Sequence, residues 1–181
     1  MITNYTNGPL VWLDLEFTDL DVKRAQIVEI ATVITDAKLN IKAIGPDLVI
    51  HQPESVLKGM VRWNQEHFSE SGLMEEIITS KVTLKRAYEE TLKFVKAHCA
   101  FKTGVLAGAS VYIDREFLGE YMPLLYDYLH FRIIDTNTIK EIMHRWYPRI
   151  PDYPKLEAHR AGKDIVESIN ELKYYQANLF K

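Results

Sequence analysis

The first part of the chain carries the hydrophobic pattern of β-strands in three successive segments. Residues 10–17, 27–35 and 41–51 are dominated by apolar and β-branched side chains, which favour extended structure. Two shorter apolar segments, residues 104–107 and 131–134, have the same character. These patterns predict five strands.

Helical periodicity separates the later predicted strands. Residues 83–98 repeat apolar or small side chains at the spacings of one buried helix face. Residues 136–146 carry a similar stripe, and a third helical pattern, after residue 159, runs to residue 179. Three strands followed by strands that alternate with helices favour an α/β fold, in which helices pack against a mixed sheet.

The composition is that of one compact domain spanning residues 1–181. The chain is 47% hydrophobic and 26% charged, which is enough apolar material for a core. A single cysteine, Cys99, excludes an internal disulfide and a cysteine-rich zinc site, and it favours a reducing compartment. Neither a membrane-spanning run nor a secretory or transit pattern is present. We expect a cytoplasmic protein with no membrane partner, and a mitochondrial location stays open.

The net charge is weakly acidic, −3 at neutral pH. Proteins that coat long nucleic acids by charge alone are usually basic, because they bind through many phosphate contacts. A short oligonucleotide needs few such contacts, so the charge mildly favours a small substrate.

Two carboxylates interrupt the first predicted strand. Because side chains alternate along a strand, Asp14 and Glu16 share one face, and Leu13, Leu15 and Phe17 take the other. Neighbouring carboxylates repel each other, and clustered oxygen ligands are what Mg²⁺ or Mn²⁺ selects. A strand with one solvated face would show the same pair, so the pair alone does not decide between a metal site and an exposed acidic face.

Three further polar residues stand at predicted element boundaries. Asp114 lies where a strand pattern gives way to a helical one, and His159 and Asp164 flank the start of the last helix. Taken singly, each has an ordinary explanation: a first-turn carboxylate, a solvent-facing histidine and a helix cap. These explanations do not account for all five residues in the order D-x-E, D, H-x4-D, which suggests a two-metal nuclease.

With these motifs the chain resembles the oligoribonucleases, a branch of the DEDDh exonuclease superfamily that is named for four acidic residues and a histidine. The resemblance covers nearly the whole chain and rests on these blocks: Leu13-Asp14-Leu15-Glu16, Ile27-Val28-Glu29-Ile30-Ala31-Thr32, Ser71-Gly72-Leu73, Asp114-Arg115-Glu116-Phe117-Leu118, Tyr121-Met122-Pro123, Phe131-Arg132-Ile133-Ile134-Asp135, Arg145-Trp146-Tyr147-Pro148, His159-Arg160-Ala161 and Asp164-Ile165. It implies a ribonuclease H-like exonuclease fold, a mixed five-stranded sheet flanked by helices, and a homodimer.

The same resemblance assigns chemistry to five residues. It implies that Asp14, Glu16, Asp114 and Asp164 bind two Mg²⁺ or Mn²⁺ ions per active site, and that His159 is the general base. The unperturbed histidine pKa of about 6.5 suits that role. The implied reaction is hydrolysis of short single-stranded RNA, dinucleotides above all, from the 3′ end to 5′-mononucleotides.

Five more positions match substrate contacts of the family. Leu20 matches a leucine that wedges against the bases, and Trp63 matches an aromatic residue at the nucleotide pocket, although both also fit a hydrophobic core. Ser110, together with Arg132 and Thr138 of the partner subunit, matches a cap on the 5′ phosphate. Arginine suits that cap because its guanidinium pairs bidentately with phosphate oxygens.

Several positions depart from the family pattern, and we expect them to cluster around substrate binding: Asp19, Phe68, Ala109, Ile113 and Asn137. Gly162-Lys163 is also unusual, since the family has a small or apolar residue followed by an acidic one there. The departures keep two alternatives open. One is a same-fold exonuclease acting on longer RNA or single-stranded DNA, and the other is a non-catalytic nucleic-acid-binding module.

Overall fold

The computed structural model describes residues 7–155 and 160–180 of the chain. Within them, five strands form one sheet: β1 (Leu10–Phe17), β2 (Ile27–Thr35), β3 (Ile41–Val49), β4 (Val105–Gly108) and β5 (Ile133–Asp135). The same residues form eight helices: α1 (Glu54–Lys58), α2 (Arg62–Glu70), α3 (Leu73–Thr79), α4 (Leu84–His98), α5 (Val111–Tyr121), α6 (Pro123–Tyr128), α7 (Thr136–Trp146) and α8 (Ala161–Leu179).

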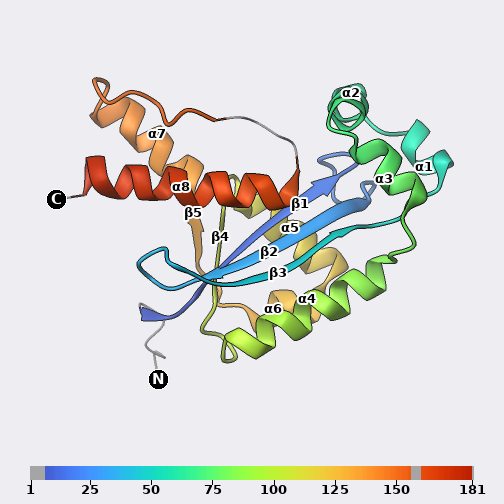
Figure 1. The fold of residues 1–181 in the computed structure, drawn as a ribbon, viewed down its shortest axis with the longest axis horizontal. Coiled ribbons are helices and arrows are strands. Elements are labelled where there is room, and N and C mark those ends of the chain that lie inside the picture. The colour runs from blue at the N-terminus through green and yellow to red at the C-terminus, as the bar shows by residue number, and fades with distance from the viewer. Residues whose placement is uncertain (1–6, 156–159, 181) are drawn as a thin grey trace.

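The sheet is mixed, and β1 lies at its centre. The strand order is β3-β2-β1-β4-β5 (Figure 1). β1, β2 and β3 follow one another without an intervening helix and are antiparallel neighbours, whereas β4 and β5 are reached through helices and run parallel to β1. The predicted mixed five-stranded sheet is therefore confirmed.

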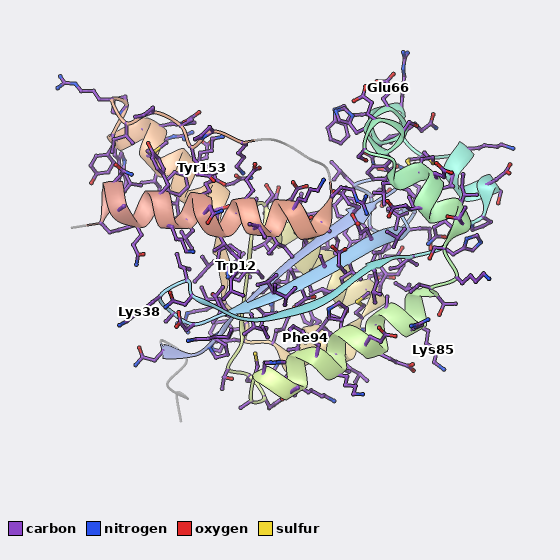
Figure 2. All side chains as sticks on the ribbon, in the orientation of Figure 1. Trp12, Lys38, Glu66, Lys85, Phe94 and Tyr153 are labelled. Carbon is purple, nitrogen blue, oxygen red and sulfur yellow. The ribbon has the colours of Figure 1, made fainter. Side chains whose placement is uncertain are left out.

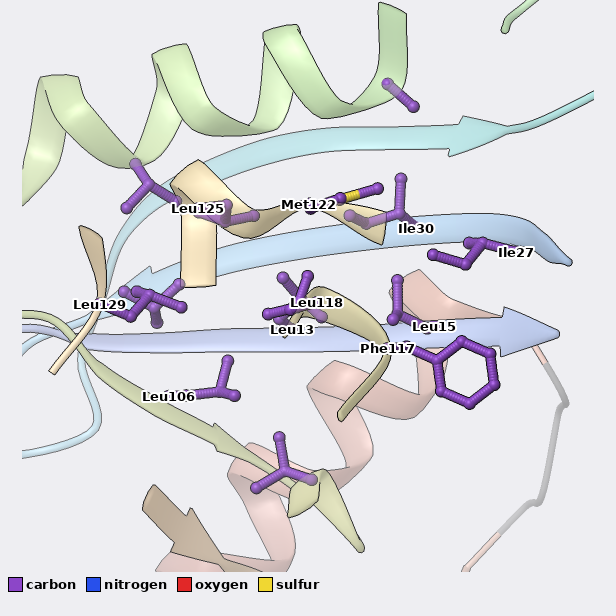
Figure 3. Close-up of a cluster of buried hydrophobic side chains, with 14 of the residues drawn as sticks. Leu13, Leu15, Ile27, Ile30, Leu106, Phe117, Leu118, Met122, Leu125 and Leu129 are labelled. Carbon is purple, nitrogen blue, oxygen red and sulfur yellow. The ribbon is translucent and has the colours of Figure 1, made fainter. Parts of the chain in front are cut away.

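Helices cover both faces of this sheet. On one face α8 crosses β1 and β2, and Trp12 of β1 packs beneath it with Ile165 and Ile169 (Figures 1 and 2). On the other face α4, α5 and α6 bury the second apolar side of the strands. Leu13 and Leu118, from β1 and α5, lie among the buried side chains there (Figure 3).

Burial decides which way the carboxylates of β1 point. The odd-numbered residues Val11, Leu13 and Leu15 are at most 4% exposed and fill the α5 side. Each such side chain gains about 1.5–3 kcal/mol from burial, so a one-residue slip of β1 is strongly disfavoured. Asp14 and Glu16 are thereby held on the opposite face, as the alternating pattern predicts.

The predicted element boundaries hold closely. The predicted bounds of β1, β2 and α7 are those observed, and α4 begins one residue late because Thr83 caps it by accepting from the Arg86 N–H. The three short helices α1, α2 and α3 were not predicted. They pack around Phe68 and Leu73 beyond the carboxyl end of β1 (Figure 1). In the described part of the chain, no helix combines the length and apolar character that crossing a membrane requires.

Candidate active site

Three of the predicted ligands converge at one face of the sheet. Asp14 and Glu16 come from β1, and Asp164 comes from the first turn of α8. One carboxylate oxygen from each lies within 4.8 Å of the others, and all three side chains are half-buried. The three oxygens form an all-oxygen ligand set of the kind that Mg²⁺ or Mn²⁺ prefers.

Asp164 is fixed by the start of its own helix. The backbone N–H of Arg160, the residue before α8, donates to Asp164 Oδ2 at 3.1 Å. This bond satisfies one of the free N–H groups at the helix start, as a cap does. The cap and the ligand interpretations of Asp164 are therefore compatible, because a second carboxylate oxygen remains.

Asp114 lies in the first turn of α5 and is only 5% exposed. Its Oδ1 accepts the backbone N–H of Leu15 at 2.9 Å, which places this carboxylate beside the backbone of β1 that links its two acidic residues. Burial, helped by the nearby charge of Asp135, raises the pKa of Asp114 to about 7, although the hydrogen bond from Leu15 opposes the rise. Asp114 is not among the three residues with oxygens inside 4.8 Å, but its charge acts on Asp14.

The cluster is electrostatically unfavourable without a cation. Burial raises the pKa of Asp14 well above its ordinary range, and the charges of Asp114, Glu16 and Asp164 raise it further. Burial, followed by the charge of Glu29 on the neighbouring strand, raises the pKa of Glu16 to about 8. Carboxylates that repel in this way are stabilised by divalent cations, so the residues present fit a metal site.

Two adjoining cavities open at the cluster. One, of about 350 Å³, is lined by Asp14, Leu15, Glu16, Trp63, Ala109, Lys155, Asp164, Glu167 and Ser168. The other, of about 480 Å³, is lined by Leu15, Glu16, Phe17, Asp19, Leu20, Val61, Trp63 and Asn64. Leu20 is 68% exposed and Trp63 is 54% exposed, so the core interpretation of both is wrong. They stand together on the wall of a cavity next to the acidic cluster.

The residues matched to the phosphate cap lie at the two ends of β5: Arg132 directly precedes the strand, whereas Ser110 and Thr138 lie near its carboxyl end. Ser110 directly precedes α5 and has a left-handed backbone, and its Oγ accepts from the Asn137 side chain of α7 at 2.8 Å. Thr138 follows Asn137 and is exposed. Arg132 is exposed, with its guanidinium 4.7 Å from the ring centre of Phe131.

The family departures divide into two groups. Asp19 and Ala109 line the cavities, and Asn137 bonds Ser110, as expected of positions near substrate. Phe68 is 1% exposed within the core of α1, α2 and α3. Ile113 is half-buried in α5 and packs against the core on that side of the sheet. Neither residue lines the two cavities, so their proximity to substrate stays a prediction.

A network around Arg160 was not anticipated from the sequence. Its guanidinium donates a hydrogen bond to Glu29 of β2 at 3.1 Å and one to each carboxylate oxygen of Glu76 in α3 at 2.8 and 2.9 Å. Glu29 is fully buried and also accepts the Ala161 N–H at 3.0 Å. Burial raises the pKa of Glu29, and these donors oppose the rise. The network ties the start of α8 to β2 and α3.

Gly162 has a packing explanation. A Cβ at this position would lie 2.3 Å from Asp47 Oδ2, so the Asp47 side chain occupies the space of the missing one. The unusual Gly162 therefore accommodates a carboxylate of β3 and gives no support to a binding module.

His159, the predicted general base, lies outside the described residues.

Comparison with known proteins identifies a family and several relatives. A family model described as Exonuclease matches residues 11–172. A probable oligoribonuclease of Dictyostelium discoideum is 47% identical over 180 residues, which cover 99% of this chain and 95% of the relative. The mitochondrial oligoribonuclease of Homo sapiens is 46% identical, covering 95% and 73%, and the oligoribonuclease of Shewanella loihica is 44% identical, covering 100% and 99%.

Solved structures show the same fold. An exonuclease I from Methylocaldum szegediense superposes with a TM-score of 0.72 at 15% identity. The zinc-bound form of an E. coli ExoI–ssDNA complex superposes with a TM-score of 0.65 at 12% identity. Each match covers 96% of this chain but only 41% of the solved chain. The likeness confirms the predicted ribonuclease H-like exonuclease fold.

Proposed function

The chain belongs to the exonuclease family, and we propose that it is a metal-dependent 3′-to-5′ exoribonuclease that hydrolyses short oligoribonucleotides, dinucleotides above all, to 5′-mononucleotides. The observation that carries the proposal is the convergence of Asp14, Glu16 and Asp164 within 4.8 Å. Relatives with 42–47% identity over nearly the whole chain are named oligoribonucleases, which supports the substrate class.

Four carboxylates would hold the metal. Asp14, Glu16 and Asp164 offer converging oxygens, and Asp114 lies beside them with one oxygen committed to Leu15. We assign two Mg²⁺ or Mn²⁺ ions to this set. Two such ions, when bound, activate a water molecule and stabilise charge on the leaving oxygen.

The remaining residues bind the substrate and move a proton. His159 precedes Arg160, and we assign it the proton of the attacking water. The exposed side chains of Trp63 and Leu20 form an apolar wall on which the terminal bases can stack. Ser110, with the partner subunit's Arg132 and the partner subunit's Thr138, would cap the 5′ phosphate and so limit substrate length.

A homodimer is part of this proposal. Phe131 is 67% exposed and Trp146 is 70% exposed, and aromatic side chains of this size are enriched in subunit interfaces. Phe131 directly precedes Arg132, and Trp146 ends α7, the helix that contains Thr138. Arg132 and Thr138 are the residues proposed to cap the 5′ phosphate bound by the other subunit. Sedimentation of the full chain tests the assembly independently of activity.

The test is product analysis of 5′-labelled oligoribonucleotides of graded length, from two nucleotides upward, with Mg²⁺ or Mn²⁺. Asp14→Ala removes one ligand, and Asp127→Ala removes an exposed carboxylate from α6 as a matched control. We expect rapid cleavage of the dinucleotide, slower cleavage of longer chains, and loss of cleavage in Asp14→Ala alone. A single-stranded DNA series of the same lengths measures sugar selectivity.

Other outcomes separate the alternatives. Equal cleavage of all lengths, or of DNA, would indicate a general exonuclease whose phosphate cap is open. Binding of oligonucleotides without metal-dependent cleavage would indicate a binding module and overturn the proposal.

A further inference from the structure

Lys155 brings a positive charge to the wall of the acidic cavity. Asp14, Glu16, Asp164 and Glu167 line that cavity with it. Among the described residues of the lining, Lys155 has the one cationic side chain, which is only 19% exposed. The proposed function gives this lysine no role.

The ammonium of Lys155 forms an ion pair with a buried carboxylate that lies outside the cavity. Its Nζ lies 2.6 Å from Glu171 Oε2, and the Tyr175 hydroxyl donates to Glu171 Oε1 at 2.7 Å. Glu171 and Tyr175 are both fully buried, and neither lines the cavity. Burial and the bond to Glu171 raise the pKa of Tyr175, so the hydroxyl keeps its proton and remains a donor.

One side of α8 connects the pair formed by Glu171 and Tyr175 to the acidic cluster. Asp164, Ser168, Glu171 and Tyr175 are separated by four, three and four residues, which places them along one side of the helix. The helix that supplies a metal ligand therefore also fixes Lys155. A rigid helix holds the ammonium and the acidic cluster at a constant separation.

The arrangement leaves donors for a ligand. An ammonium has three N–H groups, and a single carboxylate does not use them all. A lysine that only neutralised Glu171 would need no access to the cavity, yet Lys155 is part of its wall. The group that enters this cavity in the proposed reaction is a phosphodiester, an anion that an ammonium binds well.

Hydrolysis increases the negative charge at this place. The phosphodiester carries one charge, whereas the 5′-phosphate of the product carries about 1.5 to 2 at neutral pH. A cation at the cavity wall therefore interacts more strongly with the product phosphate, and with a transition state in which that charge develops, than with the substrate.

We propose that Lys155 binds the phosphate at which cleavage occurs, and that Glu171 and Tyr175 are positioning residues that hold its ammonium in the cavity. This inference rests on the proposed function, because it takes the phosphate of a nucleotide as the ligand. It adds a phosphate-binding side chain that neither binds metal nor belongs to the 5′-phosphate cap.

The test measures binding of 5′-AMP, the simplest product, to the full chain in Mg²⁺ by calorimetry, with adenosine as the ligand that lacks phosphate. Lys155→Met keeps the length of the side chain and removes its charge. Lys173→Met, on the exposed side of α8, is the matched control for net charge. We expect at least about tenfold weaker 5′-AMP binding in Lys155→Met alone, with adenosine binding unchanged.

A second variant separates phosphate binding from stability, since Lys155→Met leaves Glu171 buried without its cation. In Lys155→Met/Glu171→Gln both charges are removed, so the melting temperature should return towards that of the wild type. Phosphate binding should stay weak in this double variant and recover in Lys155→Arg. Recovery of 5′-AMP affinity in the double variant would overturn the inference, because Lys155 would then act only on Glu171.

Dinucleotide hydrolysis and 5′-AMP binding, measured on the same proteins, distinguish the role of Lys155 from the proposed function. A wild-type protein that hydrolyses dinucleotides but whose 5′-AMP affinity is unaffected by Lys155→Met would overturn the role of Lys155 and leave the proposed function intact. A wild-type protein without hydrolysis would overturn the proposed function. In that case weaker 5′-AMP binding in Lys155→Met would still support a phosphate site.

Discussion

The backbone N–H of Leu15 donates a 2.9 Å hydrogen bond to Asp114 Oδ1. The β4 strand pairs with β1 only as far as Trp12, so Asp114 provides an acceptor for the edge of β1 beyond the last paired residue. One hydrogen bond thus joins the first turn of α5 to the strand that carries Asp14 and Glu16. Asp114 consequently has a structural role and an electrostatic one, and these are separable by mutation.

Asp114→Asn keeps an oxygen acceptor for Leu15 and removes the negative charge. We expect at least about a 100-fold loss of hydrolysis, of the size seen when a group that stabilises a transition state is removed. The melting temperature of the metal-free protein should stay the same or rise, because a raised pKa means that ionised Asp114 is destabilising in the fold.

Asp114→Ala removes the acceptor as well. The buried Leu15 N–H then lacks its partner, which costs about 1–3 kcal/mol of unfolding free energy. Urea unfolding of both variants checks this difference. Equal stability of the asparagine and alanine variants would show that the hydrogen bond contributes nothing.

The acidic cluster predicts an unusual dependence of stability on pH. Glu16 has an ordinary pKa of 4.5 and a pKa of about 8 in the folded protein, so the folded state binds the proton more tightly than the unfolded state. Its stabilising contribution is complete below pH 4.5 and is lost as pH rises through 8. The raised pKa of Asp14 acts in the same direction. In EDTA, the melting temperature should fall by at least about 5 °C between pH 5.5 and 8.5.

Mg²⁺ or Mn²⁺ should reverse this fall, because metal ions and protons compete for the same oxygens. The gain in melting temperature on adding metal should therefore be larger at pH 8.5 than at pH 5.5. Asp14→Ala should reduce both the pH dependence and the gain. A metal-induced gain that is equal at both pH values would contradict the assignment of these carboxylates as ligands.

Local patterns were sufficient for most elements but not for their arrangement. The period of two places Asp14 and Glu16 on one face of β1, and apolar Leu13 and Leu15 fix which face is buried. The approach of Asp164 depends on α8 crossing β1 and β2, a contact between segments more than a hundred residues apart. Periodicity within a segment carries no information about such contacts, so the motif order and the family resemblance had to supply it.

The missed residues share a physical signature. Glu29 lies in a strand whose nine residues are all buried, and a charge in such a setting requires a partner. That signal in the sequence indicates a buried ion pair, although it does not identify Arg160 as the partner. The sequence gives a weaker signal for Lys155 and Glu171, because each alone is an ordinary charged residue and only the fold brings them together.

Arg160 should be a major determinant of stability. Arg160→Ala leaves the buried Glu29 without its cation, which costs about 3–5 kcal/mol. Glu76→Gln alters the exposed arm of the same network, where Glu76 is 48% exposed, and should cost less than about 1 kcal/mol. Arg160→Lys keeps the positive charge but not the planar guanidinium that bonds both carboxylates, so its loss of unfolding free energy should lie between those of the other two variants. Chemical denaturation of the three variants gives this order, and a mild Arg160→Ala would refute the importance of the network.

The same variant should weaken metal binding. Arg160 holds the start of α8, which carries Asp164, so its loss should lower the apparent Mg²⁺ affinity by about tenfold, as loss of a supporting residue behind a ligand does. Calorimetric titration with Mg²⁺ at a temperature where the variant is folded measures the effect. Unchanged affinity would limit Arg160 to a role in stability.

Leu20 and Trp63 allow binding to be altered with little effect on folding. They are 68% and 54% exposed, so Leu20→Ala and Trp63→Ala should change the free energy of unfolding by less than about 0.5 kcal/mol. Base stacking on such a wall contributes about 1–3 kcal/mol per base, which predicts a KM for dinucleotides raised roughly 5- to 150-fold. The effect on kcat should be smaller, because these side chains do not contact the phosphate, which the metal ions and Lys155 are proposed to bind. Steady-state kinetics on a dinucleotide separates the two parameters, with Leu124→Ala, at a 63% exposed residue of α6, as the control. A loss confined to kcat would place these side chains in the chemical step rather than in base binding.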